Sequence, residues 1–121
     1  MLLRKLIVAT ALGFLASSPV TAMEYYQLTQ AEMAAIQQEV ANNLRDPTSP
    51  IFGGARAVID RSSDMVYVCG AVNGKNAFGA YVGAEAYMGA LFRGQNGVSV
   101  FSVVGIGGQG TAQHCRQYGL L

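Results

Sequence analysis

Apolar residues recur at helical intervals after residue 28, and mainly polar residues occupy the faces between them. Thr29 and Glu32, at the start of this stretch, have the spacing of a capping box. Pro47 biases Asp46 away from helical backbone angles, so the helix should end before it. We therefore predict one amphipathic helix of about 15 residues that begins at Thr29 or Gln30. Its apolar positions are Met33, Ile36, Val40 and Leu44.

Residues 47–54 are rich in proline and glycine, and we interpret them as a linker. Beyond them the pattern changes to that of β-structure, with β-branched and aromatic residues in short runs separated by turn formers. Within residues 65–72, three valines fall on one face. Tyr67, Cys69 and Ala71 fall on the other. The strands that we predict cover residues 55–60, 65–72, 77–82, 87–92 and 98–104.

Two hairpin turns should connect four of these predicted strands. Asn73 and Gly74 form a dipeptide that favours a type I′ turn, because both residues tolerate a positive φ. Residues 77–82 would then be the returning strand. Residues 93–97, which are rich in turn formers, should close the second hairpin.

The glycine run at residues 105–110 matches the dinucleotide-binding pattern Gly-x-Gly-x-x-Gly and follows a predicted strand. That motif requires a helix after the glycines and an acidic residue about 20 positions later. Only 11 residues follow Gly110, and none of them is acidic. We therefore interpret the run as a flexible loop that leads to Cys115.

Residues 1–22 have the three-part pattern of a cleaved secretory signal peptide. Arg4 and Lys5 precede an almost wholly apolar run at residues 6–15, and Val20 to Ala22 supply small residues for cleavage. The apolar run ends after about ten residues, whereas a membrane span needs roughly 20. We expect a periplasmic or secreted protein with no stable membrane span after cleavage. An uncleaved anchor is the alternative.

For the rest of the chain, residues 23–121, we predict a single small α+β domain. In it, one N-terminal amphipathic helix packs on an antiparallel sheet of about five strands. The two cysteines of the chain, Cys69 and Cys115, can pair in only one way, and an oxidising compartment favours that pairing. Loop closure by this disulfide is worth about 4 kcal/mol. Two free, buried thiols are the alternative.

The number and distribution of basic residues exclude a nucleic-acid-binding protein. The full chain has 8 basic and 7 acidic residues, and removal of Arg4 and Lys5 with the leader leaves 6 basic against 7 acidic. Nucleic-acid binding depends on clustered lysines and arginines that contact phosphates, and these six are scattered. The pattern assigns neither a named partner nor an oligomeric state.

Few residues could support catalysis. His114 is the only histidine, so a metal site with several histidine ligands is excluded. In an exported protein, two cysteines and one histidine more often mean a disulfide and an uninvolved histidine than a metal site. Glu85 with Asp64, or Asp60 with Asp64, could form a carboxylate pair of the kind that hydrolyses glycosides. Acidic residues at turns are usually only solvated. We therefore expect no enzyme activity, no cofactor and no metal.

The segment Asn73-Gly74-Lys75-Asn76 has more hydrogen-bonding groups than a two-residue turn needs. In one interpretation, this segment is a recognition loop for a protein partner or a saccharide, and Tyr81 provides an aromatic contact. Alternatively, the Asn76 side chain bonds the backbone and only fixes the hairpin. Of the two readings, we favour the structural one for Asn76. The candidate binding residues are Asn73, Lys75, Asn76 and Tyr81.

Two blocks of the sequence resemble small exported proteins of Gram-negative bacteria that are usually described as uncharacterised. Residues 46–53 match Asp-Pro-x-Ser-x-x-Phe-Gly, and residues 68–83 match Val-Cys-Gly-x-Val-Asn-x-Lys-Asn-x-x-Gly-x-Tyr-x-Gly. The matched region spans about 40 of the 99 residues from 23 to 121. Ala80 replaces an expected glycine, and Ala86-Tyr87 replaces a proline and an aromatic residue. The resemblance implies export and a helix-plus-sheet domain. It does not indicate any particular activity.

Together these observations predict an exported, non-catalytic interaction module that binds a protein partner in the cell envelope. An inhibitor, or an accessory of an envelope or secretion machine, would fit. The alternative is a cell-wall or glycan-binding protein, and only remotely a hydrolase. Its contacts would be Tyr81, Tyr87, Asn76 and Glu85. A structural envelope protein without a discrete site is a third possibility.

Overall fold

The computed structural model describes residues 10, 11, 13 and 23–121. The expected signal peptide, its cleavage site included, therefore lies almost wholly outside the described residues. Five strands and two α-helices make up the described part, with a short 3₁₀ turn at Gln95–Gly97. In chain order they are β1 (Met23–Tyr26), α1 (Gln30–Asn42), β2 (Ile51–Asp60), β3 (Met65–Asn73), β4 (Glu85–Arg93), β5 (Ser99–Ile106) and α2 (Gly108–Gln117).

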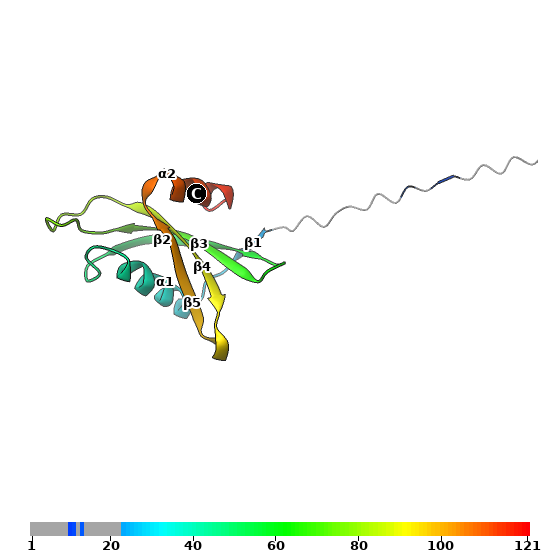
Figure 1. Ribbon diagram of the computed structural model, residues 1–121, viewed down its shortest axis with the longest axis horizontal. Helices are drawn as coiled ribbons and strands as arrows, with labels where there is room; N and C mark the ends of the chain where they lie inside the picture. The colour runs from blue at the N-terminus through cyan, green and yellow to red at the C-terminus, as the bar shows by residue number, and fades with distance from the viewer. Residues whose placement is uncertain (1–9, 12, 14–22) are drawn as a thin grey trace, which may run out of the picture.

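The strands form one antiparallel sheet in the order β1-β2-β3-β4-β5, so each strand pairs with its neighbour in the sequence. α1 connects β1 to β2 and lies against one face of the sheet, whereas α2 lies against the other face (Figure 1). The α+β class, the number of strands and the antiparallel arrangement are confirmed, but β1 takes the place of the strand that was predicted at residues 77–82. The expectation of a single N-terminal helix is wrong, because β1 precedes α1 and a second helix follows β5.

α1 begins where its capping box predicts. The Glu32 amide donates to Thr29 Oγ1 at 3.1 Å, and the Thr29 amide donates to Glu32 Oε1 at 3.0 Å. These bonds satisfy two amides that the first turn of a helix otherwise leaves free. Ile36 and Val40 are fully buried against the sheet, as their helical spacing predicts.

The sheet buries side chains on both faces. Toward α1, Val66, Val68 and Val72 of β3 join the main core. Toward α2, Cys69 joins a smaller cluster in which Met88 and Leu120 are also buried. The predicted alternation of β3 is therefore confirmed for these positions, because successive strand residues point to opposite faces.

The connections around β2 and β3 differ from the sequence prediction. β2 begins at Ile51, so residues 51–54 belong to a strand and not to a linker. Residues 77–82 form no strand, and the chain returns to the sheet only at Glu85. Neither Asn73 nor Gly74 adopts a positive φ, so the predicted type I′ turn is absent from this connection. The second predicted hairpin, formed by β4 and β5, is confirmed.

α2 corrects the prediction of a flexible loop at residues 105–110. Gly107 and Gly108 have φ values of 71° and 82°, which non-glycine residues rarely adopt, and they redirect the chain from β5 into the helix. Cys115 is fully buried on the sheet-facing side of α2 and forms a disulfide with Cys69, 46 residues earlier. The predicted pairing is thus confirmed.

Within the residues described, neither α-helix has the length and apolar character that a membrane crossing requires.

Candidate functional site

The connection between β3 and β4, residues 74–84, is a long loop with ordered internal bonding; we call it the 74–84 loop. Lys75 and Tyr81 form an isolated β-bridge across it. Beyond this bridge, the Asn76 amide donates to the carbonyl of Ala80 at 2.8 Å, and the Gly79 amide donates to the carbonyl of Asn76 at 3.0 Å. The backbone therefore closes a small turn at the tip of the loop.

Two asparagine side chains complete this closure. Asn76 Oδ1 accepts hydrogen bonds from the amides of Phe78 at 2.9 Å and Ala80 at 3.1 Å. Asn73 Oδ1 accepts one from the amide of Gly83 at 3.0 Å, at the base of the loop. Asparagine side chains that bond nearby backbone in this way replace the bonds of a regular ladder. The interpretation that Asn76 fixes the turn therefore agrees with the hydrogen bonds that its side-chain oxygen accepts.

Lys75 and Tyr81 contact each other. The Lys75 ammonium lies over the Tyr81 ring, 5.3 Å from its centroid, which is a cation–π arrangement. The Tyr81 hydroxyl donates a 2.9 Å hydrogen bond to the backbone carbonyl of Ser49. Tyr81 therefore ties the 74–84 loop to the segment that precedes β2.

The Asp46 carboxylate organises the segment that precedes β2. Asp46 accepts hydrogen bonds from the Thr48 amide at 2.9 Å, the Thr48 hydroxyl at 2.6 Å and the Ser49 hydroxyl at 2.8 Å. These bonds favour the ionised carboxylate and, together with a smaller effect of the charge of Lys75, lower the pKa of Asp46 to about 2. The two sequence blocks that suggested an exported family, residues 46–53 and 68–83, thus meet at the base of the 74–84 loop.

The tip of the 74–84 loop carries an aromatic side chain. Phe78 is 95% exposed, the most exposed large apolar residue in the described part of the chain. Its amide donates to Asn76, and Gly79, with a φ of 77°, follows it in the turn. Val82 in the same loop and Ile51 at the start of β2 are also more than half exposed. The fold therefore places Phe78 on a projecting, internally bonded turn with its ring in solvent.

Phe78 is not among the residues predicted from the sequence, because the pattern of residues 77–82 predicts a strand in which a phenylalanine would be packed. The available signal was local. Asn76 and Gly79 are turn-forming residues on either side of an aromatic residue, and a turn at that point leaves the aromatic side chain without a core to enter.

Of the residues considered for hydrolytic chemistry, Glu85 and Asp64 do not come together. Glu85 pairs with Val72 at one end of β3, whereas Asp64 immediately precedes the other end. Asp60 accepts hydrogen bonds from the Ser62 amide and hydroxyl, which lower its pKa and hold the turn between β2 and β3. His114 is exposed on α2. No cluster of three or more His, Cys, Asp or Glu side chains that could hold a metal occurs in the described residues.

A hollow of about 460 Å³ lies at the opposite end of the sheet, between the β2–β3 turn and the end of β4. Tyr26 and Glu32 line it, and the Tyr26 hydroxyl donates to the Glu32 carboxylate at 2.9 Å. Burial raises the pKa of Tyr26, Glu32 raises it further, and Arg93 opposes this effect. Glu32 also caps α1, so its carboxylate has a structural role in this hollow.

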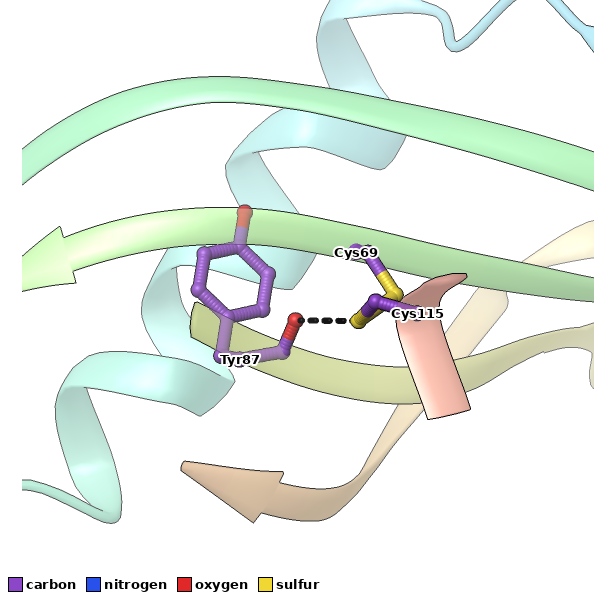
Figure 2. Close-up of a disulfide and its surroundings, with 3 residues drawn as sticks. All are labelled: Cys69, Tyr87 and Cys115. Atoms are coloured by element: carbon purple, nitrogen blue, oxygen red, sulfur yellow. Dashed lines mark hydrogen bonds between the residues drawn. A yellow bond between two sulfur atoms is a disulfide. The ribbon is translucent and has the colours of Figure 1, made fainter. Parts of the chain in front are cut away.

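The disulfide and Tyr87 lie inside the protein, between the two helices. Figure 2 shows the Tyr87 carbonyl oxygen facing the Cys115 sulfur, 3.8 Å away, with the phenol ring directed away from the disulfide. Tyr87 is fully buried, and burial raises its pKa to about 12. Its hydroxyl oxygen has no hydrogen-bond partner among the residues that the structure describes. Gly70 makes room for the ring, because a β-carbon at that position would overlap the phenol of Tyr87.

Comparisons with known proteins found no match to a protein-family model, to a curated protein or to a solved structure. The resemblance to exported Gram-negative proteins therefore stays a prediction from the sequence. The geometry identifies the 74–84 loop, with Phe78 at its tip, as the candidate site.

Proposed function

We propose that this protein is an exported, non-catalytic interaction module that binds a protein partner through the 74–84 loop. Phe78 is the central contact. An inhibitor or an accessory of an envelope or secretion machine would use such a loop by inserting the ring into a recess of its partner. The observation that carries the proposal is the exposure of Phe78 on a turn whose backbone is already closed.

The exposed ring provides the binding free energy. Complete burial of a phenylalanine side chain is worth about 1.5–3 kcal/mol, and aromatic residues are frequent among the few contacts that dominate protein interfaces. Phe78 makes no such contribution to the fold, because its ring remains in water. Binding to a partner would bury it.

The internal bonding of the loop lowers the entropy cost of binding. Ordering a free loop at an interface costs conformational entropy that reduces affinity. Here Asn76 fixes the turn on both sides of Phe78, and Tyr81 anchors the loop to Ser49. The candidate residues Asn73, Lys75, Asn76 and Tyr81 therefore act mainly by presenting Phe78, and their exposed groups add polar contacts around it.

Export is part of the same proposal. The disulfide between Cys69 and Cys115 suits an oxidising compartment, such as the periplasm or the medium, where such bonds persist. The signal-like pattern of residues 1–22 supports the same location.

The test is affinity capture from an envelope extract of the host with oxidised protein spanning residues 23–121. The Phe78→Ala variant removes the ring and keeps the bonds of the turn. Tyr25→Ala is the matched control, since Tyr25 is an exposed aromatic residue on β1. We expect one identified partner to be retained by the wild type and the control, and to be lost roughly tenfold or more from Phe78→Ala. Equal retention by all three proteins would refute the proposal.

A Lys75→Ala, Asn76→Ala double variant tests the proposal less cleanly. It removes the side chain that fixes the turn and the cation that covers Tyr81. Loss of binding would then have two explanations, whereas Phe78→Ala changes the presented group alone.

Glycan binding has less support from the geometry. Tyr87, one of its expected contacts, is fully buried. One face of the Tyr81 ring is covered by Lys75, which leaves less of the ring to stack on a sugar. Retention of the protein on purified peptidoglycan, reduced by Tyr81→Ala but not by Phe78→Ala, would favour the glycan and contradict the protein-binding proposal.

A further inference from the structure

The turn between β4 and β5 contains the dipeptide Asn96-Gly97. An asparagine that precedes glycine is especially prone to spontaneous deamidation, because glycine has no β-carbon to hinder the approach of its backbone nitrogen to the asparagine side chain. The chain has two such dipeptides, Asn73-Gly74 and Asn96-Gly97. The fold places them in different surroundings, and these surroundings decide which of the two asparagines can react.

Asn73 is held by the sheet and by its own side chain. It ends β3, where it pairs with Ile51 of β2, and it is half-buried. Its Oδ1 accepts the 3.0 Å hydrogen bond from the Gly83 amide. Deamidation requires the backbone of the asparagine to rotate until its side-chain carbonyl carbon meets the nitrogen of the next residue. At Asn73 this rotation would break the pairing with β2 and open the base of the 74–84 loop.

Asn96 lies in a less restrained place. It is exposed, and it belongs to the short 3₁₀ turn and not to a strand. Asn96 and Gly97 have φ values of 73° and 72°. The Gly97 nitrogen donates only a long hydrogen bond, 3.3 Å, to the Gly94 carbonyl. Rotation at Asn96 therefore disturbs a weakly closed turn in solvent, whereas the 2.7 Å bond from the Gly94 amide to the Val98 carbonyl can remain.

We propose that Asn96 is a site of spontaneous modification in the folded protein, where it becomes aspartate or isoaspartate, and that the fold protects Asn73 from the same reaction. The Gly97 nitrogen attacks the side-chain carbonyl carbon of Asn96 and loses its proton. The carbon–nitrogen bond of the side-chain amide breaks, ammonia leaves and a succinimide ring is formed. Water then opens the ring. Attack of water at the side-chain carbonyl gives aspartate, and attack at the main-chain carbonyl gives isoaspartate.

The reaction changes the charge and the backbone of the turn. Residues 94–98 contain no charged side chain, and either product adds a carboxylate there. Isoaspartate also lengthens the main chain next to the Gly97 nitrogen, so it should loosen the bond to Gly94. The 74–84 loop lies at the other end of β4, which begins at Glu85 and ends at Arg93. The proposal therefore holds whether or not that loop binds a protein.

The test incubates oxidised protein spanning residues 23–121 in mildly alkaline buffer prepared with water enriched in heavy oxygen, and maps its peptides by mass spectrometry. Hydrolysis of the succinimide incorporates the heavy oxygen, which separates this reaction from any deamidation that preceded the incubation. We expect labelled aspartate and isoaspartate at position 96, formed roughly tenfold or more faster than at position 73, because only the second site must open before it reacts. Electron-based fragmentation distinguishes the two products.

The unfolded chain is the matched control. In urea with a thiol reductant, neither dipeptide keeps the bonds of the fold, so both asparagines should deamidate at similar rates. Asn96→Gln, whose longer side chain cyclises far more slowly, should abolish labelling at position 96 while circular dichroism shows unchanged folding. Equal rates at positions 73 and 96 in the folded protein, or no label at position 96 when the unfolded chain reacts there, would overturn the proposal.

Discussion

The Tyr81 hydroxyl donates a hydrogen bond to the backbone carbonyl of Ser49, 2.9 Å away and 32 residues earlier in the chain. This bond joins the 74–84 loop to the turn that Asp46 organises before β2. The loop therefore has a fixed attachment at its base in addition to the closed turn at its tip. Phe78 is therefore presented from a supported position.

Tyr81→Phe should remove the bond to Ser49 and keep the aromatic ring under Lys75. We expect a loss of about 1 kcal/mol in the free energy of unfolding, as for a typical hydrogen bond, measured by urea denaturation. Tyr25→Phe, which removes a hydroxyl from an exposed tyrosine on β1, is the control and should change stability little. Equal effects of the two variants would contradict an anchoring role for the Tyr81 hydroxyl.

Asn76→Ala should loosen the tip of the loop. The variant loses the acceptor for the amides of Phe78 and Ala80, so both amides should exchange with solvent faster. We expect a stability loss of about 1–2 kcal/mol and weaker partner binding, because Phe78 is no longer held in place. Asn42→Ala, at an exposed position on α1, is the matched control. Unchanged exchange at Phe78 and Ala80 would refute this role of Asn76.

Local sequence signals predicted the elements that local bonds determine. α1 was identified because its capping box and its helical spacing act within a few residues of each other. The Asn73-Gly74 dipeptide was misleading because its turn preference is weaker than the longer-range bonds of the two asparagine side chains. The positive φ angles that were expected there occur at Gly79 and Gly83.

α2 depends on contacts that no local pattern contains. α2 has glycines at its start and few apolar residues, so its helical propensity is low. It is held to the sheet by the Cys69–Cys115 disulfide and by the stacking of Tyr118 on Tyr67, at 4.7 Å between ring centroids. The position of Phe78 follows from where the loop turns, which Asn76 decides.

Asp46 should contribute to stability in a pH-dependent manner. Its pKa is about 2 in the folded protein, against an ordinary value of 3.8, so the folded state binds a proton less readily than the unfolded chain. The stabilisation that the Asp46 carboxylate provides is complete at pH values above 3.8, and it is lost as the pH falls from 3.8 to about 2. Asp46→Asn should therefore flatten this part of the curve of unfolding free energy against pH.

Asp60 provides the internal control for that titration. Hydrogen bonds from Ser62 lower its pKa as well, so the Asp46→Asn variant should keep the part of the acid dependence that Asp60 contributes. Urea denaturation between neutral pH and pH 2 measures both proteins. Superimposable curves would show that the Thr48 and Ser49 hydroxyls do not hold the Asp46 carboxylate in solution.

Tyr87→Phe should leave the protein as stable as the wild type or make it more stable by up to about 1 kcal/mol. Within the described part of the chain the buried hydroxyl has no hydrogen-bond partner, so its removal relieves a desolvation cost and keeps the packed ring. Thermal or urea unfolding measures the change, with Tyr67→Phe, at a half-buried tyrosine, as the control. A loss of more than about 1 kcal/mol for Tyr87→Phe alone would mean that the hydroxyl is bonded.

The most direct measurement of the central claim is photo-crosslinking from the tip of the loop in an envelope extract. A benzophenone amino acid replaces Phe78 in one protein and Tyr25, on β1, in the control. We predict one protein crosslinked from position 78, identified by mass spectrometry, and its absence from position 25. No product from position 78, or the same products from both positions, would contradict the claim that the protein binds a partner through the 74–84 loop.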